Sequence, residues 1–110
     1  MTTPGILPRP GTRAIDETDE QIEPPYHLIL LDDQEHTYQY VIHMLGQVFG
    51  YSVEKAFAIA CMVDSTGQAI LLTASRDEVE RKQEEVHAFG PDPLMPTCKG
   101  SMSAIIEPAV

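Results

Sequence analysis

The chain has 110 residues, enough for one domain at most, and leaves little material for a deep catalytic cleft. Its 17 acidic and 7 basic residues give a formal charge of −10. This charge argues against nucleic acid and anionic membranes as partners, because both attract clustered Lys and Arg. A hydrophobic content of 43% and a charged content of 22% are those of an ordinary folded protein.

The first 25 residues differ in composition from the rest of the chain. They hold five of the nine prolines and a cluster of acidic residues at Asp16, Glu17, Asp19, Glu20 and Glu23. Residues 1–25 are therefore predicted to be a flexible, acidic, Pro-rich N-terminal arm, either a solubilising extension or a segment presented to a partner. Residues 26–110 are predicted to be the folded core domain.

Within this core, Tyr26–Leu31 (YHLILL) is a β-prone apolar run after two prolines and predicts a buried strand. From Thr37 to Phe49 the apolar residues recur at helical spacing, and Gly50 is a natural helix end. Ser52 is a plausible N-cap for a second helix that ends before a turn at 64–67. Its residues of helical spacing are Val53, Ala56, Phe57, Ala60 and Val63.

The second half of the core follows with Gln68–Thr73 as a strand and with Ser75 and Glu78 as the capping box of a third helix. A loop over Pro91–Gly100 contains three prolines and leads to Met102–Glu107, an alternating final strand. The order strand, helix, helix, strand, helix, strand predicts an α+β fold. We expect a two-layer sandwich with helices on one face of a three-stranded sheet.

Few motifs in the chain carry chemistry. No GxSxG, Walker loop or GxGxxG is present, which adds to the argument against an elaborate enzyme. Cys61 and Cys98 form no CxxC and have no His or Cys at zinc-ligand spacing, which argues against a zinc site. With no signal peptide or membrane-spanning run, we expect a cytoplasmic protein with reduced thiols, in which Cys61 is a small buried side chain and Cys98 has no assigned role.

The polar step Asp32, Asp33, Gln34, Glu35, His36 is the most distinctive local feature, because four titratable groups follow a buried strand directly. One interpretation is a solvated loop that caps the next helix. A calcium loop is disfavoured, since the spacing lacks the Gly and the distal Glu of an EF-hand. A third interpretation is a cation-binding mouth completed by Asp64.

The stretch Tyr26–Ile42, YHLILLDDQEHTYQYVI, resembles the opening of the ClpS adaptor core, which has a hydrophobic strand, an Asn-Asp-Asp step and a helix running Met-Glu-Phe-Val-Ile. The resemblance covers about 80 residues. It passes through Glu54, Lys55 and Ala56, then Gly67, Ala69, Ile70, Thr73 and Ala74, and ends at Ile106 and Glu107.

This resemblance implies a ClpS-like fold with an antiparallel sheet, similar to the C-terminal domain of ribosomal protein L7/L12. It also implies a binding protein that is not an enzyme and needs no cofactor. This would be an adaptor of the bacterial Clp protease, a monomer that captures N-terminal residues of N-degron substrates (the N-end rule) and delivers them to a ClpA- or ClpC-type unfoldase. The unfoldase-facing surface would lie near Ser75–Arg81, although a solvated helix face explains those charges equally well.

The resemblance also assigns site residues, and several depart from the family pattern. The substrate α-amine would be held by Asp32, Gln34 and Asp64, where the family has Asn, Asp and His. The hydrophobic pocket would comprise Tyr38, Val41, Ala60, Val63 and Met102, where Tyr38 and Ala60 replace Met. We expect amine binding to survive with altered side-chain preference. The alternatives are a ClpS-fold interaction domain that has lost N-degron binding, and a cation-binding protein that uses Asp32, Asp33 and Asp64.

Overall fold

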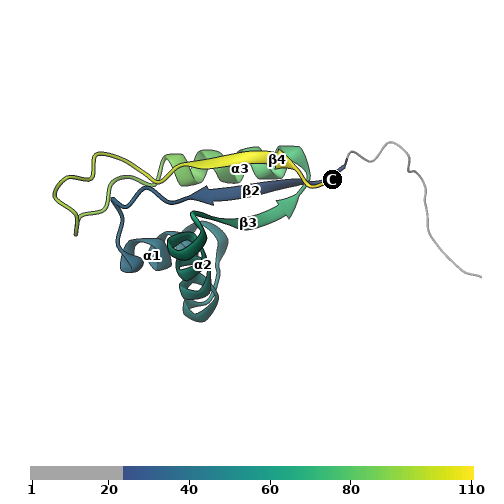
Figure 1. Cartoon of the computed structure of the whole chain (residues 1–110). Coiled ribbons are helices and arrows are strands. Elements are labelled where there is room, and N and C mark those ends of the chain that lie inside the picture. The colour runs from purple at the N-terminus through teal and green to yellow at the C-terminus, as the bar shows by residue number, and fades with distance from the viewer. Residues whose placement is uncertain (1–23) are drawn as a thin grey trace, which may run out of the picture.

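The computed structural model describes residues 24–110 (Figure 1). The predicted arm falls almost entirely outside these residues, so its division from a core starting at Tyr26 stays a prediction. In chain order the elements are β2 (Tyr26–Leu31), α1 (Tyr38–Phe49), α2 (Val53–Thr66), β3 (Gln68–Ala74), α3 (Arg76–His87) and β4 (Ala104–Pro108). This order confirms the predicted α+β fold.

The sheet is three-stranded and antiparallel, with β2 in the centre between β3 and β4. Because side chains alternate along a strand, Leu28 and Leu30 face the helices and are fully buried, while Ile29 faces the opposite side. All three helices contribute to the one core that covers Leu28 and Leu30. Figure 1 shows α3 running along the strands while α2 projects across their direction. The helical layer therefore lies on one face of the sheet, as expected for a two-layer sandwich.

The helix ends follow the local signals in the sequence. Thr37, Ser52 and Ser75 are N-caps whose side chains accept hydrogen bonds from the backbone N–H groups of Tyr40, Lys55 and Glu78. Gly50 ends α1 in the left-handed region at φ 73°, which glycine adopts without strain. None of the described helices is long and apolar enough to span a bilayer.

Three local predictions need correction. Val53 and Phe57 share the helical period of the buried positions of α2, yet they are 63% and 49% exposed. The core face of α2 is narrow, because only Ala56, Ala60 and Val63 are buried. The final strand begins at Ala104 and not at Met102, although Met102 is buried. The predicted turn at 64–67 is also shorter, since α2 continues to Thr66.

The loop between α3 and β4 is tied to the start of α1 by Asp92, which is only 2% exposed. One carboxylate oxygen accepts from Thr37 N–H at 2.6 Å, and the other accepts from Leu94 N–H at 2.8 Å. Burial alone would raise the pKa of Asp92, but these hydrogen bonds outweigh burial and leave the pKa below its usual value. The long, Pro-rich loop is thereby held against the N-terminal end of α1, which forms part of the candidate site described below.

Candidate functional site

A small pocket of about 190 Å³ opens where the end of β2, α1, α2 and the segment before β4 meet. Its lining contains all eight residues that the resemblance assigned to amine or side-chain binding. They are Asp32, Gln34, Tyr38, Val41, Ala60, Val63, Asp64 and Met102, and Asp33 and His36 line the pocket with them. The fold therefore brings together residues from four separate segments, while their role in binding stays a prediction.

The polar wall of the pocket is the turn between β2 and α1. The Asp32 carboxylate accepts from Gln34 N–H at 3.3 Å, and the Asp33 carboxylate accepts from Glu35 N–H at 3.0 Å. Gln34 has φ 61°, a left-handed conformation that costs a non-glycine residue about 1 kcal/mol or more. Two successive side-chain-to-backbone hydrogen bonds hold this strained residue at the pocket mouth.

Tyr38 and Asp64 meet at the mouth of the pocket. The Tyr38 hydroxyl donates to Asp64 Oδ2 at 3.0 Å, and the Tyr38 ring makes an edge contact with Phe57, with centroids 5.7 Å apart. The hydrogen bond to Asp64, assisted by desolvation and by the negative charge of Asp64, raises the pKa of Tyr38 to about 12. The phenol therefore remains a donor throughout the physiological pH range.

The floor of the pocket is apolar. Val41 comes from α1, Ala60 and Val63 come from α2, and Met102 precedes β4, and all four are at most 5% exposed. Ala60 is the smallest of these side chains, so it leaves space beneath Tyr38. A single aliphatic or aromatic group is the kind of ligand that such a floor accommodates.

His36 was not assigned a site role from the sequence, yet its ring forms part of the pocket wall. Its Nδ1 lies 2.9 Å from Asp33 Oδ1, and its Nε2 lies 2.8 Å from the carbonyl oxygen of Gly100. The side chain of His36 is 3% exposed. The sequence gives no signal for this contact, because Gly100 is 64 residues away along the chain.

The mouth is chemically suited to a primary ammonium group. Asp32 and Asp64 each use one carboxylate oxygen in the hydrogen bonds above, and the other oxygen can accept from a ligand. The side-chain amide oxygen of Gln34 is a further acceptor, and an ammonium has three N–H donors. Among residues 24–110 no three His, Cys, Asp or Glu side chains are arranged to hold a metal ion.

Comparisons with known proteins agree with the fold and identify a family. The family model of the ATP-dependent Clp protease adaptor protein ClpS matches residues 21–96, well over half of the chain. The ClpS adapter protein of Rhodococcus jostii is 33% identical over 81 residues, which cover 74% of this chain and 72% of that protein. The ClpS adapter protein of Streptomyces avermitilis is 29% identical over 92 residues, covering 82% and 88% of the two chains.

A solved structure supports the same fold. Agrobacterium tumefaciens ClpS2, determined with bound L-phenylalaninamide, superposes with a TM-score of 0.66 and 24% sequence identity. The match covers 77% of this chain and 96% of that one. At this identity the similarity establishes the fold.

Proposed function

The chain belongs to the ClpS family of Clp protease adaptors, and on that premise we propose that its pocket captures the N-terminal residue of a protein substrate. The observation that carries this proposal is the convergence of Asp32, Gln34 and Asp64 above an apolar floor. An α-ammonium and a hydrophobic first side chain are the two groups that such a pocket can recognise together.

The amine end is recognised by charge. Asp32 and Asp64 offer two carboxylates in place of the one in the family pattern, so the attraction to an ammonium is retained. In the empty pocket the two negative charges repel each other, and a bound cation relieves this repulsion. The Tyr38 hydroxyl already donates to one oxygen of Asp64, so it has to shift or share that carboxylate when the amine binds.

The side-chain end is recognised by shape. Tyr38 narrows the mouth, whereas Ala60 deepens the floor, relative to the two Met residues of the family pattern. The first side chain of the substrate is therefore selected by a pocket of similar total size but of different form. Binding rather than catalysis is the proposed role, with a ClpA- or ClpC-type unfoldase as the partner that receives the substrate.

The decisive experiment compares peptides that differ only in their first residue. Fluorescence anisotropy of peptides beginning with Leu, Phe, Tyr, Trp or a polar control residue would measure affinity at neutral pH. We expect saturable binding for at least one hydrophobic first residue. An N-acetylated version removes the ammonium charge and should bind at least about tenfold more weakly, because a charged hydrogen bond contributes roughly 1.5–3 kcal/mol. Equal binding of free and acetylated peptides would contradict the proposal.

A second candidate function rests on the Tyr38 to Asp64 hydrogen bond, which crosses the mouth of a pocket of only about 190 Å³. If this contact remains closed, the domain keeps the ClpS fold and recognises another peptide or partner. Tyr38→Met distinguishes the two candidates, because it restores the family residue. Peptide binding by the variant but not by the native protein would favour the second candidate.

A further inference from the structure

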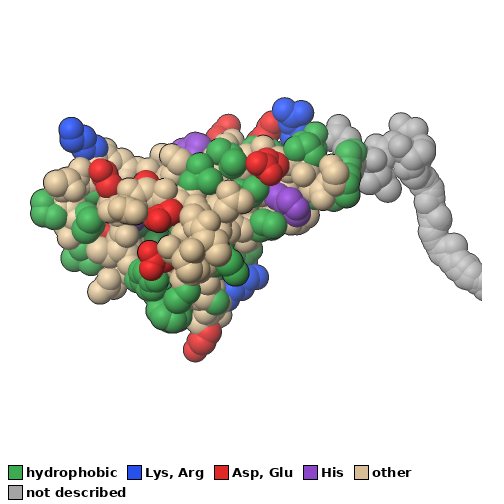
Figure 2. Space-filling view, in the orientation of Figure 1, with side chains coloured by type: hydrophobic (Ala, Val, Ile, Leu, Met, Phe, Trp, Pro, Cys, Tyr) green, Lys and Arg blue, Asp and Glu red, His purple; other side chains and the backbone are tan. Residues whose placement is uncertain are grey.

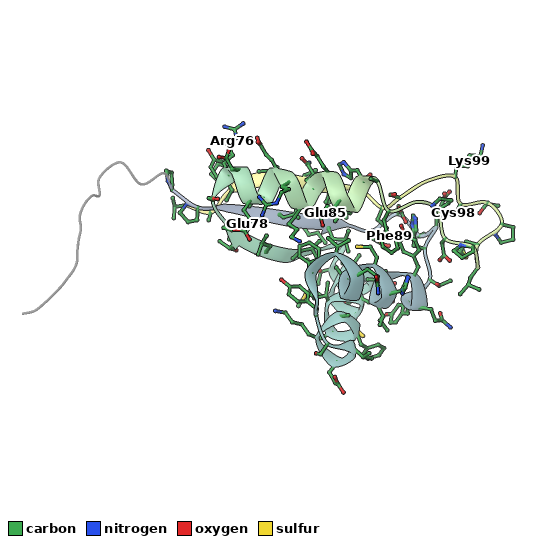
Figure 3. The ribbon with its side chains drawn as sticks, turned by 180° about the vertical axis from the view of Figure 1, so that it is seen from behind. Arg76, Glu78, Glu85, Phe89, Cys98 and Lys99 are labelled. Atoms are coloured by element: carbon green, nitrogen blue, oxygen red, sulfur yellow. The ribbon has the colours of Figure 1, made fainter. Side chains whose placement is uncertain are left out.

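The side chains of a cysteine, a histidine and an aspartate contact one another in a row beside the candidate pocket. Cys98 Sγ is 3.2 Å from His36 Nε2, and His36 Nδ1 is 2.9 Å from Asp33 Oδ1. Cys98 comes from the loop between α3 and β4, and the other two come from the turn between β2 and α1. Figure 3 shows Cys98 at the end of the molecule opposite Arg76. This is the arrangement of a nucleophile, a base and a group that orients the base.

Hydrogen bonds on both sides fix the position of the His36 ring. Both ring nitrogens face oxygen acceptors, the Asp33 carboxylate on one side and the Gly100 carbonyl at 2.8 Å on the other. A carboxylate oxygen cannot donate, so Nδ1–H donates to Asp33, and Nε2 is the nitrogen that faces Gly100 and Cys98. The ring is also 97% buried, since its side chain is 3% exposed, and packs on Tyr40 with centroids 4.5 Å apart.

His36 Nε2 lies within hydrogen-bond distance of the Cys98 sulfur and of the Gly100 carbonyl oxygen, to which the Cys98 thiol also donates at 3.2 Å. Asp92 donates its backbone N–H to the same sulfur at 3.2 Å. The imidazole is placed to take up the thiol proton, and the Asp92 N–H stabilises negative charge on the sulfur, whose thiolate is the nucleophilic form of cysteine. The contacts of Cys98 with His36 and Asp92 therefore hold the Pro91–Gly100 loop in place and also favour the reactive thiolate.

We propose that Cys98 is a nucleophilic thiol activated by His36 and a site of covalent modification by hydrogen peroxide. The sulfur attacks one oxygen of the peroxide, the O–O bond breaks, and the departing oxygen leaves as water after taking up the thiol proton. The thiol and hydrogen peroxide thus become a sulfenic acid and water, with two electrons passing from sulfur to peroxide. The reaction requires no bound peptide and is independent of the proposed adaptor function.

Cys61 is a matched internal control for Cys98. Both cysteines are free and both are partly buried, so accessibility alone predicts similar reactivity. Cys61 lies on α2 beside the phenol of Tyr38, whereas Cys98 lies beside an imidazole. The difference in their rates measures the effect of His36.

The first measurement treats the native protein with a limiting amount of iodoacetamide and quantifies alkylation of Cys98 and Cys61 by peptide mass spectrometry. We expect Cys98 to react about tenfold faster or more, because reactivity follows the thiolate population. In urea the two rates should become similar. Equal rates in the native protein, or a faster Cys61, would overturn the proposal.

Substitution of His36 tests the proposal directly, because activation by His36 and simple packing of the loop predict opposite changes in the rate of Cys98 alkylation. His36→Asn should slow Cys98 to about the rate of Cys61, whereas simple loosening of the loop would expose Cys98 and accelerate it. His43→Asn, on the exposed side of α1, is the matched control and should leave the ratio unchanged. Acceleration by His36→Asn would overturn the proposal.

The second measurement exposes the protein to hydrogen peroxide in the presence of dimedone, which traps sulfenic acid. We expect the dimedone adduct on Cys98 and little on Cys61, with Asp33→Asn reducing the yield at Cys98 by loss of the group that orients His36. An adduct distributed equally between the cysteines, or found on Cys61 alone, would overturn the assignment.

Discussion

Two hollows, a groove and the candidate pocket, lie on opposite sides of α2 and differ in volume and in the chemistry of their linings. The groove between α2 and β3 has a volume of about 640 Å³ and is largely apolar, with Ala58, Ile59, Met62 and Ile70 among its residues. The candidate pocket is about 190 Å³, yet carboxylates from two elements converge on it. Figure 2 shows acidic side chains on the segments beside α1, which itself contains no Asp or Glu, next to an apolar area.

This difference shows that the volume of a hollow does not by itself identify the binding site. The larger groove offers apolar area but little that fixes the orientation of a ligand. The smaller pocket combines a strained turn, a hydrogen bond across its mouth and a buried floor, and each of these restricts what can bind. Specific recognition is therefore expected in the pocket and not in the groove, and the following predictions test that comparison.

The largest effect on peptide affinity is expected from placing a phenylalanine in the pocket, and the same substitution in the groove is the control. Ala60→Phe occupies the pocket floor and should weaken peptide binding about a hundredfold, equivalent to roughly 3 kcal/mol. Ala58→Phe places the same ring on the exposed groove side of α2 and should leave affinity within about threefold of native, a difference of well under 1.4 kcal/mol.

Anisotropy titrations with a hydrophobic N-terminal peptide measure both variants. Urea denaturation provides the control for folding, since an added ring at a buried position costs about 1–3 kcal/mol by overpacking. Loss of binding in Ala58→Phe but not in Ala60→Phe would reverse the assignment of the two hollows.

A smaller but still large effect is expected from removing one charge at the pocket mouth. Asp64→Asn should weaken binding of a peptide with a free amine by about tenfold to a hundredfold, because a hydrogen bond to a charged group contributes roughly 1.5–3 kcal/mol. The acetylated peptide should be nearly insensitive to the same substitution. Asp77→Asn removes an exposed charge from α3 and serves as the control. If Asp77→Asn has the same effect, then net charge and not the pocket determines affinity.

Asp92, which ties the loop between α3 and β4 to the start of α1, should contribute to the stability of the fold. Asp92→Asn weakens the hydrogen bonds to Thr37 and Leu94 and should lower the free energy of unfolding by about 1–2 kcal/mol, the range of a helix cap. The folded pKa of Asp92 is depressed, so its contribution is present above the unfolded value near 4 and is lost as pH falls through the folded pKa.

Urea denaturation at several pH values measures this contribution. The native protein and Asp92→Asn should differ at neutral pH and converge in acid. A difference that is independent of pH would contradict the role assigned to the carboxylate.

The smallest effect concerns the hydroxyl at the pocket mouth. The Tyr38 phenol is expected to titrate near pH 12, and Asp64→Asn should bring that step closer to the usual value of about 10. Because the folded pKa is raised, the associated stability is present below the unfolded pKa and is lost as pH rises through the folded value. Phenolate absorbance measures the titration, and Tyr38→Phe identifies the step that belongs to this residue. A step that is unmoved by Asp64→Asn would exclude Asp64 as its cause.

Much of the fold could be predicted from the sequence because its signals act over a few residues. Ser52 and Ser75 cap helices through atoms three residues away, and Gly50 ends α1 because it can adopt φ 73°. Alternation in the strands and helical spacing in α1 and α3 identify the buried faces for the same reason. The outward position of Phe57 could not be predicted, since its spacing fits the core and only the width of the packed face excludes it.

The candidate site was named by resemblance, and its assembly was decided by tertiary structure. The sequence by itself determined the order of elements, their caps and the acidic step after β2. Only the folded chain brings Thr37 to Asp92, 55 residues apart, and His36 to Cys98, 62 residues apart. Contacts over such separations depend on how the whole helical layer packs on the sheet and on the path of an irregular loop, and no local pattern encodes either.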